Sequence, residues 1–176
     1  MEQGLEEKKV TSTEVYHGSF LRIYEDKVLL PNGKEASREY VKHPGATAVV
    51  PVTSDGRIVL VRQYRYPVGK VTLEIPAGKL DAGEEPLICA KRELKEETGY
   101  VAESWTKLTS LLTTPGFTDE VIHLYKAESM RFDEACPDED EFIHMCLCTP
   151  EEIRRMIADE TIVDAKTLVA LFMADI

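Results

Sequence analysis

Three glutamates in one short segment are the residues of this sequence best placed to do chemistry. Glu93, Glu96 and Glu97 stand at positions i, i+3 and i+4, which lie next to one another on the surface of an α-helix. Like charges at this spacing destabilise a helix by about 0.2–0.5 kcal/mol per pair, so the cluster needs a compensating gain. A hard divalent cation supplies one, because Mg²⁺ takes oxygen ligands and shares its shell between carboxylates and substrate phosphates.

The alternative is a solvated acidic face, the usual meaning of a run of charges. Three neighbouring features weigh against it. Arg92 is adjacent to Glu93 and can hold a carboxylate in place, and the glycine-bounded loop 78–83 can bring backbone close to the same ligand. An apolar stripe beside the acids predicts that the helix packs and places them at its border; it consists of Leu87, Ala90 and Leu94.

The helix that carries the acids is predicted over 86–98, because proline favours the first turn and Gly99 ends the pattern. A capping box at Thr149 opens a second helix to about Ala158. A third helix is capped by Asp164 and runs to Met173.

Short apolar runs separated by turn residues predict strands around these helices. Asn32-Gly33 and the turn 54–56 each predict a hairpin. We therefore expect an α/β (α+β) fold with a small N-terminal antiparallel β subdomain, residues 1–44, followed by the main domain, residues 45–176. The expected strands lie within 15–24 (with a break at Gly18), 27–30, 37–41, 46–53, 58–61, 71–75, 105–112, 121–127 and 142–148.

The composition limits the classes of molecule that this protein is expected to bind. Hydrophobic residues make up 43% and charged residues 30% of 176, which is typical of a globular protein, and the formal net charge is −11 without any Lys/Arg-rich run. Nucleic acid and anionic membranes are therefore not expected as partners. The charged N-terminus does not resemble a secretory signal, so we expect a cytoplasmic protein without disulfides, in which Cys146 and Cys148 are small packed side chains.

Spaced residues from Gly78 to Tyr100 resemble the complete Nudix box. The resemblance implies an α/β/α sandwich with a mixed sheet, and a reaction in which water attacks a phosphorus of a diphosphate linked to another group. It covers the box residues Gly78, Glu84, Arg92, Glu93, Glu96, Glu97 and Gly99.

The resemblance also implies roles for these residues. Glu93 and Glu97 would be direct metal ligands, Glu96 a ligand or a holder of metal-bound water, and the carbonyl of Ala77 a further ligand. Arg92 would orient the carboxylates, and Glu84 would stand near the site at the helix start. The metal would be Mg²⁺, with Mn²⁺ as the alternative, in two or three ions. Gly78 and Gly99 would serve as turn and C-cap glycines.

Features beyond the box resemble ADP-ribose pyrophosphatases: Pro115-Gly116 fifteen residues past Tyr100, the segment 74–78, and Gln63-Tyr64-Arg65. The resemblance implies hydrolysis of ADP-ribose to AMP and ribose 5-phosphate. GDP-mannose hydrolases and other nucleoside-diphosphate-sugar hydrolases share much of the pattern and are the alternative. Two further alternatives for the function are a non-catalytic nucleotide-binding module and an acidic interaction domain.

The substrate residues are Arg65, for a phosphate or the terminal ribose, and the loop at Pro115 and Gly116. In the N-terminal part, Phe20 and Arg38 would stack on or flank the adenine and Glu39 would accept from its amino group; the alternative for Phe20 is plain core.

The catalytic residues would be Arg92, Glu96 and a general base outside the box. Glu139 and Glu141 are the candidates, with Asp138 if the alignment slips, against a solvated acidic loop. A homodimer is expected, in which the N-terminal β part, too small to bury much surface alone, exchanges with the partner chain and completes its site.

Overall fold

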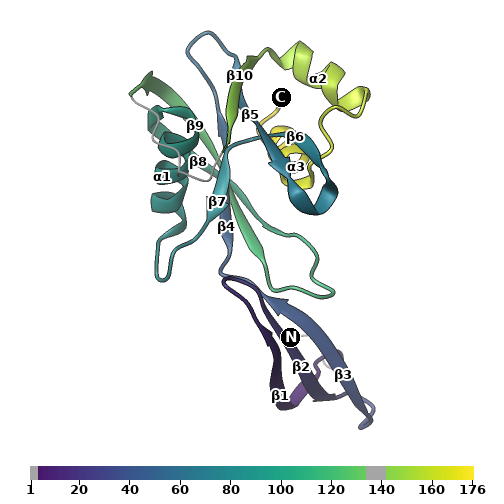
Figure 1. The fold of residues 1–176 in the computed structure, drawn as a ribbon. Helices are drawn as coiled ribbons and strands as arrows, with labels where there is room; N and C mark the ends of the chain where they lie inside the picture. Colours follow the sequence, from purple (N-terminus) through teal and green to yellow (C-terminus); the bar gives the residue numbers. More distant parts are fainter. Residues whose placement is uncertain (1–3, 134–141) are drawn as a thin grey trace. The chain divides into compact units, whose positions relative to one another are not determined.

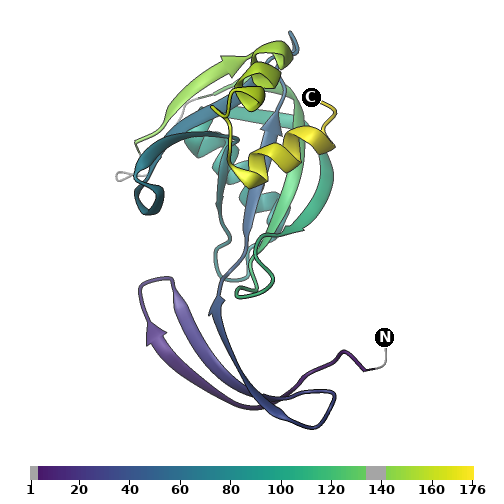
Figure 2. The ribbon, with the colours of Figure 1, turned by 90° about the vertical axis from the view of Figure 1, so that its right-hand side faces the viewer.

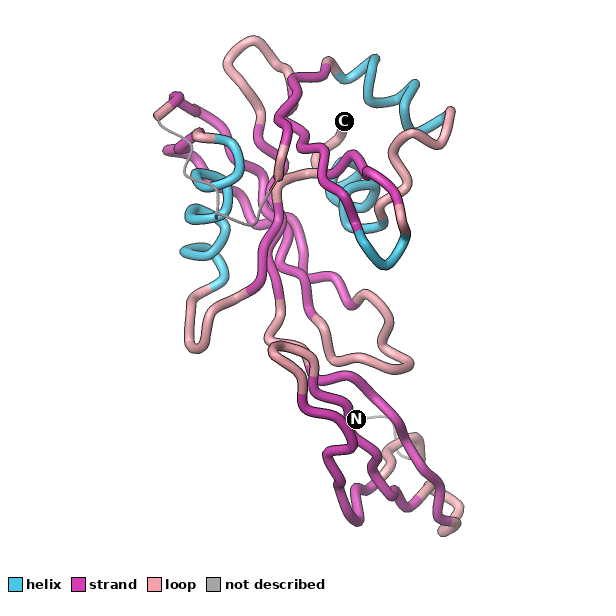
Figure 3. The backbone as a smooth tube through the Cα atoms, in the orientation of Figure 1, coloured by secondary structure: helices cyan, strands magenta, loops and turns pink. Residues whose placement is uncertain are grey.

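The computed structural model describes residues 4–133 and 142–176 and divides into two compact units. Met1–Pro44 and Leu112–Glu120 form the first, and Gly45–Leu111 and Val121–Ile176 form the second. The segment Leu112–Glu120 thus joins the N-terminal part in space, which the division expected at residue 44 did not include. Figure 3 shows the first unit as strand and loop, and all helices in the second.

The first unit is an antiparallel sheet in the order β1-β2-β3, with β1 Lys8–His17, β2 Arg22–Leu29 and β3 Glu35–Lys42 (Figure 2). The predicted Asn-Gly hairpin joins β2 to β3. There the Leu30 N–H donates to the Lys34 carbonyl at 2.8 Å, and Gly33 has φ 80°. A positive φ is one that glycine adopts without steric cost, so the local turn chemistry is confirmed.

The β structure expected over 15–24, with a break at Gly18, is confirmed as two strands. β1 ends at His17 and β2 begins at Arg22, and the Gly18 N–H closes a turn by donating to the Leu21 carbonyl at 2.8 Å. The expected break at Gly18 is thus the turn between β1 and β2.

The second unit has two sheets. A mixed sheet runs in the order β7-β4-β9-β8, with β4 parallel to β9 and antiparallel to β7, and an antiparallel sheet runs β10-β5-β6. The strands are β4 Ala46–Pro51, β5 Ile58–Arg65, β6 Lys70–Glu74, β7 Ala77–Lys79, β8 Tyr100–Leu112, β9 Val121–Phe132 and β10 His144–Cys148. A short 3₁₀ helix, Tyr66–Val68, joins β5 to β6.

Helices cover this core as a sandwich (Figure 1). They are α1 Pro86–Thr98, α2 Pro150–Ala158 and α3 Ala165–Met173. β4 is buried on both faces: Ala48 and Val50 pack in the cluster that contains the buried residues of α2 and α3, and Val49 packs with Ala90 and Leu94 of α1. The predicted α/β sandwich and all three helices, with their caps, are confirmed.

The second predicted hairpin is only partly correct. The turn forms, with the Thr53 N–H donating to the Arg57 carbonyl at 2.9 Å, but β4 and β5 then enter different sheets. β4 and the first half of β5 are buried, and each strand finds its ladder partners in the core and not across the turn. Cys146 and Cys148 pack in the same apolar cluster, as expected. No helix of the described residues is long and apolar enough to cross a membrane.

Candidate functional site

The acidic helix is α1, and its glutamates divide between its faces. Proline occupies the first turn, and Gly99 ends the helix with φ 72° while its N–H donates to the Lys95 carbonyl at 2.8 Å. Glu93 and Glu97 are only 7% and 8% exposed. The apolar stripe has turned these two carboxylates toward the protein, so a solvated acidic face does not describe them.

Arg92 is the centre of the acidic cluster. Its Nε and Nη2 donate to both oxygens of Glu84, at 3.0 and 2.9 Å. Its Nη1 donates to Glu93 at 2.6 Å and to Glu96 at 3.0 Å. A planar guanidinium can hold several carboxylates at fixed angles, which a lysine cannot. The guanidinium of Arg92 therefore orients three of the four box glutamates, Glu84, Glu93 and Glu96.

Arg92 keeps Glu84 ionised. The hydrogen bonds from Arg92, helped by the Asp81 N–H, lower the pKa of Glu84 to about 2. The same bond to Glu84, with the nearby charge of Glu93, raises the pKa of Arg92. At neutral pH Glu84 is therefore a carboxylate held in a fixed direction by Arg92.

The strand β7 approaches α1 very closely. The Ala77 N–H donates to Oε2 of Glu97 at 3.2 Å. A Cβ added to Gly78 would lie 1.9 Å from Cδ and Oε1 of Glu93. Gly78 therefore stands in a strand where the Glu93 carboxylate leaves no room for a side chain, and its expected role as a turn glycine is wrong. Gly99 is the C-cap glycine that was expected.

These residues fit a hard divalent cation by their chemistry. The available donors are the carboxylates of Glu93, Glu96 and Glu97 and the backbone beside them, all oxygen, as Mg²⁺ prefers. Within residues 4–133 and 142–176 no three acidic, histidine or cysteine side chains surround one point as a ready cage, and Arg92 is bonded to Glu93 and Glu96. The donor set and the space kept by Gly78 are thus the observations that favour a metal.

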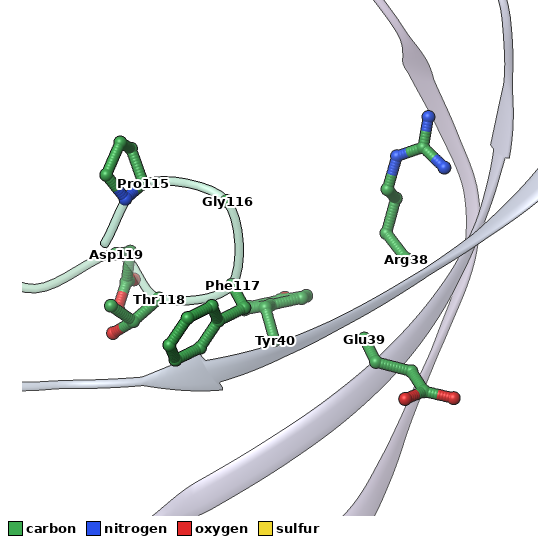
Figure 4. A pocket seen from close by; sticks show the side chains of 8 residues that line it. All are labelled: Arg38, Glu39, Tyr40, Pro115, Gly116, Phe117, Thr118 and Asp119. Carbon is green, nitrogen blue, oxygen red and sulfur yellow. The ribbon is translucent and has the colours of Figure 1, made fainter.

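The first unit contains a separate pocket of about 270 Å³ (Figure 4). Arg38 and Glu39 point to opposite sides of β3. The loop 115–119 is bonded to the end of β3. The Val41 N–H donates to the Phe117 carbonyl at 2.8 Å, and Asp119 forms an ion pair with Lys42 at 2.6 Å. The pocket is lined by Arg38, Glu39, Tyr40, Pro115, Gly116, Phe117, Thr118 and Asp119.

Four of the six predicted substrate residues line this pocket: Arg38, Glu39, Pro115 and Gly116. Tyr40 and Phe117 also line it and were not selected from the sequence, although each directly follows a selected residue. For Tyr40 the usable signal was an aromatic ring two residues after Arg38, because such rings stack on planar groups.

The predicted substrate and catalytic residues differ in exposure and in the side chains that they contact. Phe20 is 49% exposed, so the alternative that it is a core residue is wrong for the single chain. Arg38 donates two N–H groups to Glu7, and Arg65 binds Glu74 with two hydrogen bonds of 2.9 and 2.8 Å. Asp138, Glu139 and Glu141 lie outside the described residues.

Comparison with known families accounts for nearly the whole chain. Residues 42–171 match the NUDIX domain model. Residues 7–41 match the model of the nucleoside diphosphate sugar hydrolase N-terminal domain. The boundary between the two matches falls where β3 ends.

Individual relatives agree with this. An ADP-ribose pyrophosphatase of Bacillus subtilis (strain 168) is 44% identical over 171 residues, 96% of this chain and 92% of the relative. A methanol dehydrogenase activator of Bacillus methanolicus is 45% identical over 168 residues, 94% and 91% of the two chains. A crystal structure of an ADP compounds hydrolase superposes with a TM-score of 0.86 at 22% identity, covering 99% of this chain and 95% of that one, and shows that the fold is shared.

Proposed function

This chain belongs to the NUDIX family, and from that premise we propose that it hydrolyses the diphosphate linkage of ADP-ribose to AMP and ribose 5-phosphate. The observation that carries the proposal is the acidic cluster, in which buried Glu93 and Glu97 lie beside β7 and Arg92 orients Glu93. The similarity to an ADP-ribose pyrophosphatase over 96% of the chain supports the choice of substrate.

The proposed metal ligands are the carboxylates of Glu93 and Glu97 and the carbonyl of Ala77, with Glu96 as a ligand or a holder of metal-bound water. Two or three Mg²⁺ ions, or Mn²⁺ in their place, would neutralise charge on the diphosphate and acidify the attacking water when bound. The chain's own part is positioning, because diphosphate cleavage depends mainly on alignment and charge neutralisation. Arg92 keeps the carboxylates of Glu84, Glu93 and Glu96 aligned. A glutamate of the segment 138–141, Glu139 or Glu141, is the proposed general base.

The pocket of the first unit is proposed to take the nucleoside. Its mixture of aromatic rings, Arg38 and backbone from Pro115 and Gly116 suits a flat base. Glu39 would accept from the adenine amino group, and Phe20 would stack on the base. Arg65 is proposed for a phosphate or the terminal ribose.

A homodimer is part of the proposal. β1 is exposed along its whole length, and a three-stranded sheet of this size buries little surface alone. Exchange of this unit between chains would let Phe20, Arg38 and Glu39 complete the partner's site. Light scattering tests it, since a monomeric mass at micromolar concentration rejects the dimer.

A substrate panel with product analysis tests the activity. We expect AMP and ribose 5-phosphate from ADP-ribose in millimolar Mg²⁺, with at least tenfold higher kcat/KM than for GDP-mannose, NADH, diadenosine polyphosphates or 8-oxo-dGTP. A preference for GDP-mannose would favour the nucleoside-diphosphate-sugar alternative. Binding of ADP-ribose in a calorimeter without any turnover would instead indicate a non-catalytic module, and no binding an acidic interaction domain.

A second candidate function rests on the relative named as a methanol dehydrogenase activator, 45% identical over 94% of this chain. The test is the turnover of methanol dehydrogenase with and without this protein. The Glu97→Gln variant is the control, because it separates activation that needs hydrolysis from activation by binding.

A further inference from the structure

A buried carboxylate outside the box joins three elements of the second unit. Glu74, the last residue of β6, is only 2% exposed. It accepts hydrogen bonds from Arg65 of β5, from the Thr72 hydroxyl at 2.5 Å and from Lys166 of α3. Lys166 is 92 residues away in the sequence and also pairs with Asp164 at 3.0 Å. Every oxygen of Glu74 is thus engaged from more than one direction.

The charge on Glu74 is retained despite its burial. Burial alone would raise the pKa of its carboxyl, but the hydrogen bond from Arg65 and the charge and hydrogen bond of Lys166 bring it down to about 2. A buried carboxylate that is fully paired in this way is an anchor of fixed position. Thr72 and Lys166 hold it from two sides, so it cannot follow a mobile partner into solvent.

Arg65 is the partner that this anchor fixes. It ends β5, and its side chain is 40% exposed, whereas that of Glu74 is buried. Nε and Nη2 are the atoms that Glu74 binds. Among the described residues, Nη1 has no hydrogen-bond partner, so one edge of the guanidinium is pinned and the other is available. A guanidinium held by one edge loses little freedom when its other edge binds an anion.

We propose that Glu74 is a positioning residue for the substrate: it holds Arg65 by one edge so that Nη1 meets the anionic diphosphate sugar. The inference rests on the proposed function and adds a residue that makes no contact with the substrate itself. The competing explanation is that Glu74 only ties α3 to the sheet through Lys166. The two explanations differ in which partner of Glu74 matters for binding.

Steady-state kinetics on four variants separates them. Glu74→Gln keeps the shape but loses the charge that pins Arg65, and we expect KM for ADP-ribose to rise about tenfold with kcat changed less than about threefold. That split is the mark of a lost contact that is equally strong in the ground and transition states. Arg65→Lys should show the same split, and Glu74→Gln combined with Arg65→Lys should be no worse than Arg65→Lys alone.

Lys166→Met is the matched control, because it removes the link to α3 and leaves the pair of Glu74 and Arg65. We expect it to lower the melting midpoint while KM stays within about twofold of the wild type. Losses that multiply in the double variant, or a rise of KM in Lys166→Met equal to that in Glu74→Gln, would overturn the inference in favour of a purely structural role.

A measurement on the wild-type protein tests the inference even if Glu74→Gln does not fold. The ¹⁵Nε signal of Arg65, assigned by its loss in Arg65→Lys, should shift when ADP-ribose is added in EDTA. An unchanged signal in a sample that binds ADP-ribose overturns the inference. If the wild type neither binds nor hydrolyses any compound of the panel, the proposed function itself fails, and the inference fails with it. If the wild type hydrolyses ADP-ribose but the losses of the two single variants multiply in the double variant, the inference is rejected and the proposed function stands.

Discussion

Adding one methyl group at Gly78 is the sharpest perturbation of the acidic cluster. In Gly78→Ala the new Cβ would lie 1.9 Å from Cδ and Oε1 of Glu93 and 2.3 Å from Oε2. To reach ordinary contact at 3.4 Å, the carboxyl carbon has to move by about 1.5 Å. The backbone offers no other reason for strain, because Gly78 is not among the glycines with positive φ.

The expected effect is large on activity and modest on stability. A misplacement of about 1 Å in a catalytic constellation can reduce the rate about 100-fold, so we expect kcat/KM to fall at least that far. The moving group is the end of a flexible side chain, so the cost in folding is at most that of its charge-assisted hydrogen bond with Arg92, about 3 kcal/mol. That corresponds to a fall in melting midpoint of no more than about 12 °C for a chain of this size.

The assay is steady-state hydrolysis of ADP-ribose beside thermal unfolding of the same samples. Gly56→Ala is the control: Gly56 has φ 80° with nothing within 4 Å of an added Cβ, so it should lose about 1–2 kcal/mol from backbone strain and keep its activity. If Gly78→Ala keeps kcat/KM within about threefold of the wild type, the position of the Glu93 carboxylate does not matter, and the reasoning is refuted.

Three further predictions concern charge. Glu97→Gln should lower kcat at least about 100-fold and raise the Mg²⁺ concentration needed for half-maximal rate; near-normal kinetics would remove Glu97 from the ligands. Mg²⁺ at about 100 times its Kd should stabilise the fold by about 2.7 kcal/mol, or roughly 5–11 °C in the melting midpoint, and an unshifted midpoint counts against a preformed site. Because the pKa of Glu74 is lowered from 4.5 to about 2, its charge stabilises the fold fully above pH 4.5 and loses this effect as the pH falls toward 2. The stabilities of wild type and Glu74→Gln should therefore converge over that range in acid-unfolding curves, and parallel curves would contradict this.

The helices were predictable because their signals are local. Proline at the first turn and Gly99 after the last one bound α1, and the capping box at Thr149 and the Asp164 cap bound the starts of the other two. Each signal satisfies backbone groups within one turn of the helix end. The spacing of Glu93 and Glu97 likewise determined that both would share the face of α1 that its apolar stripe buries.

Strand partners and the supporting side chains depend on contacts between distant parts of the chain. Nothing near β4 and β5 indicates that the turn between them separates two sheets. The bond of Lys166 to Glu74 spans 92 residues, and that of the His43 N–H to Asp119 spans 76. Such pairs follow from the packed fold, so the anchor of Arg65 was visible only in the structure.

The most direct test of the account is a crystal structure with Mg²⁺ and a non-hydrolysable ADP-ribose analogue. The account predicts at least one ion with oxygens of Glu93 and Glu97 at about 2.0–2.1 Å, in contact with the diphosphate. An analogue bound with no ion on these two carboxylates, and with Glu93 still paired to Arg92, would contradict it.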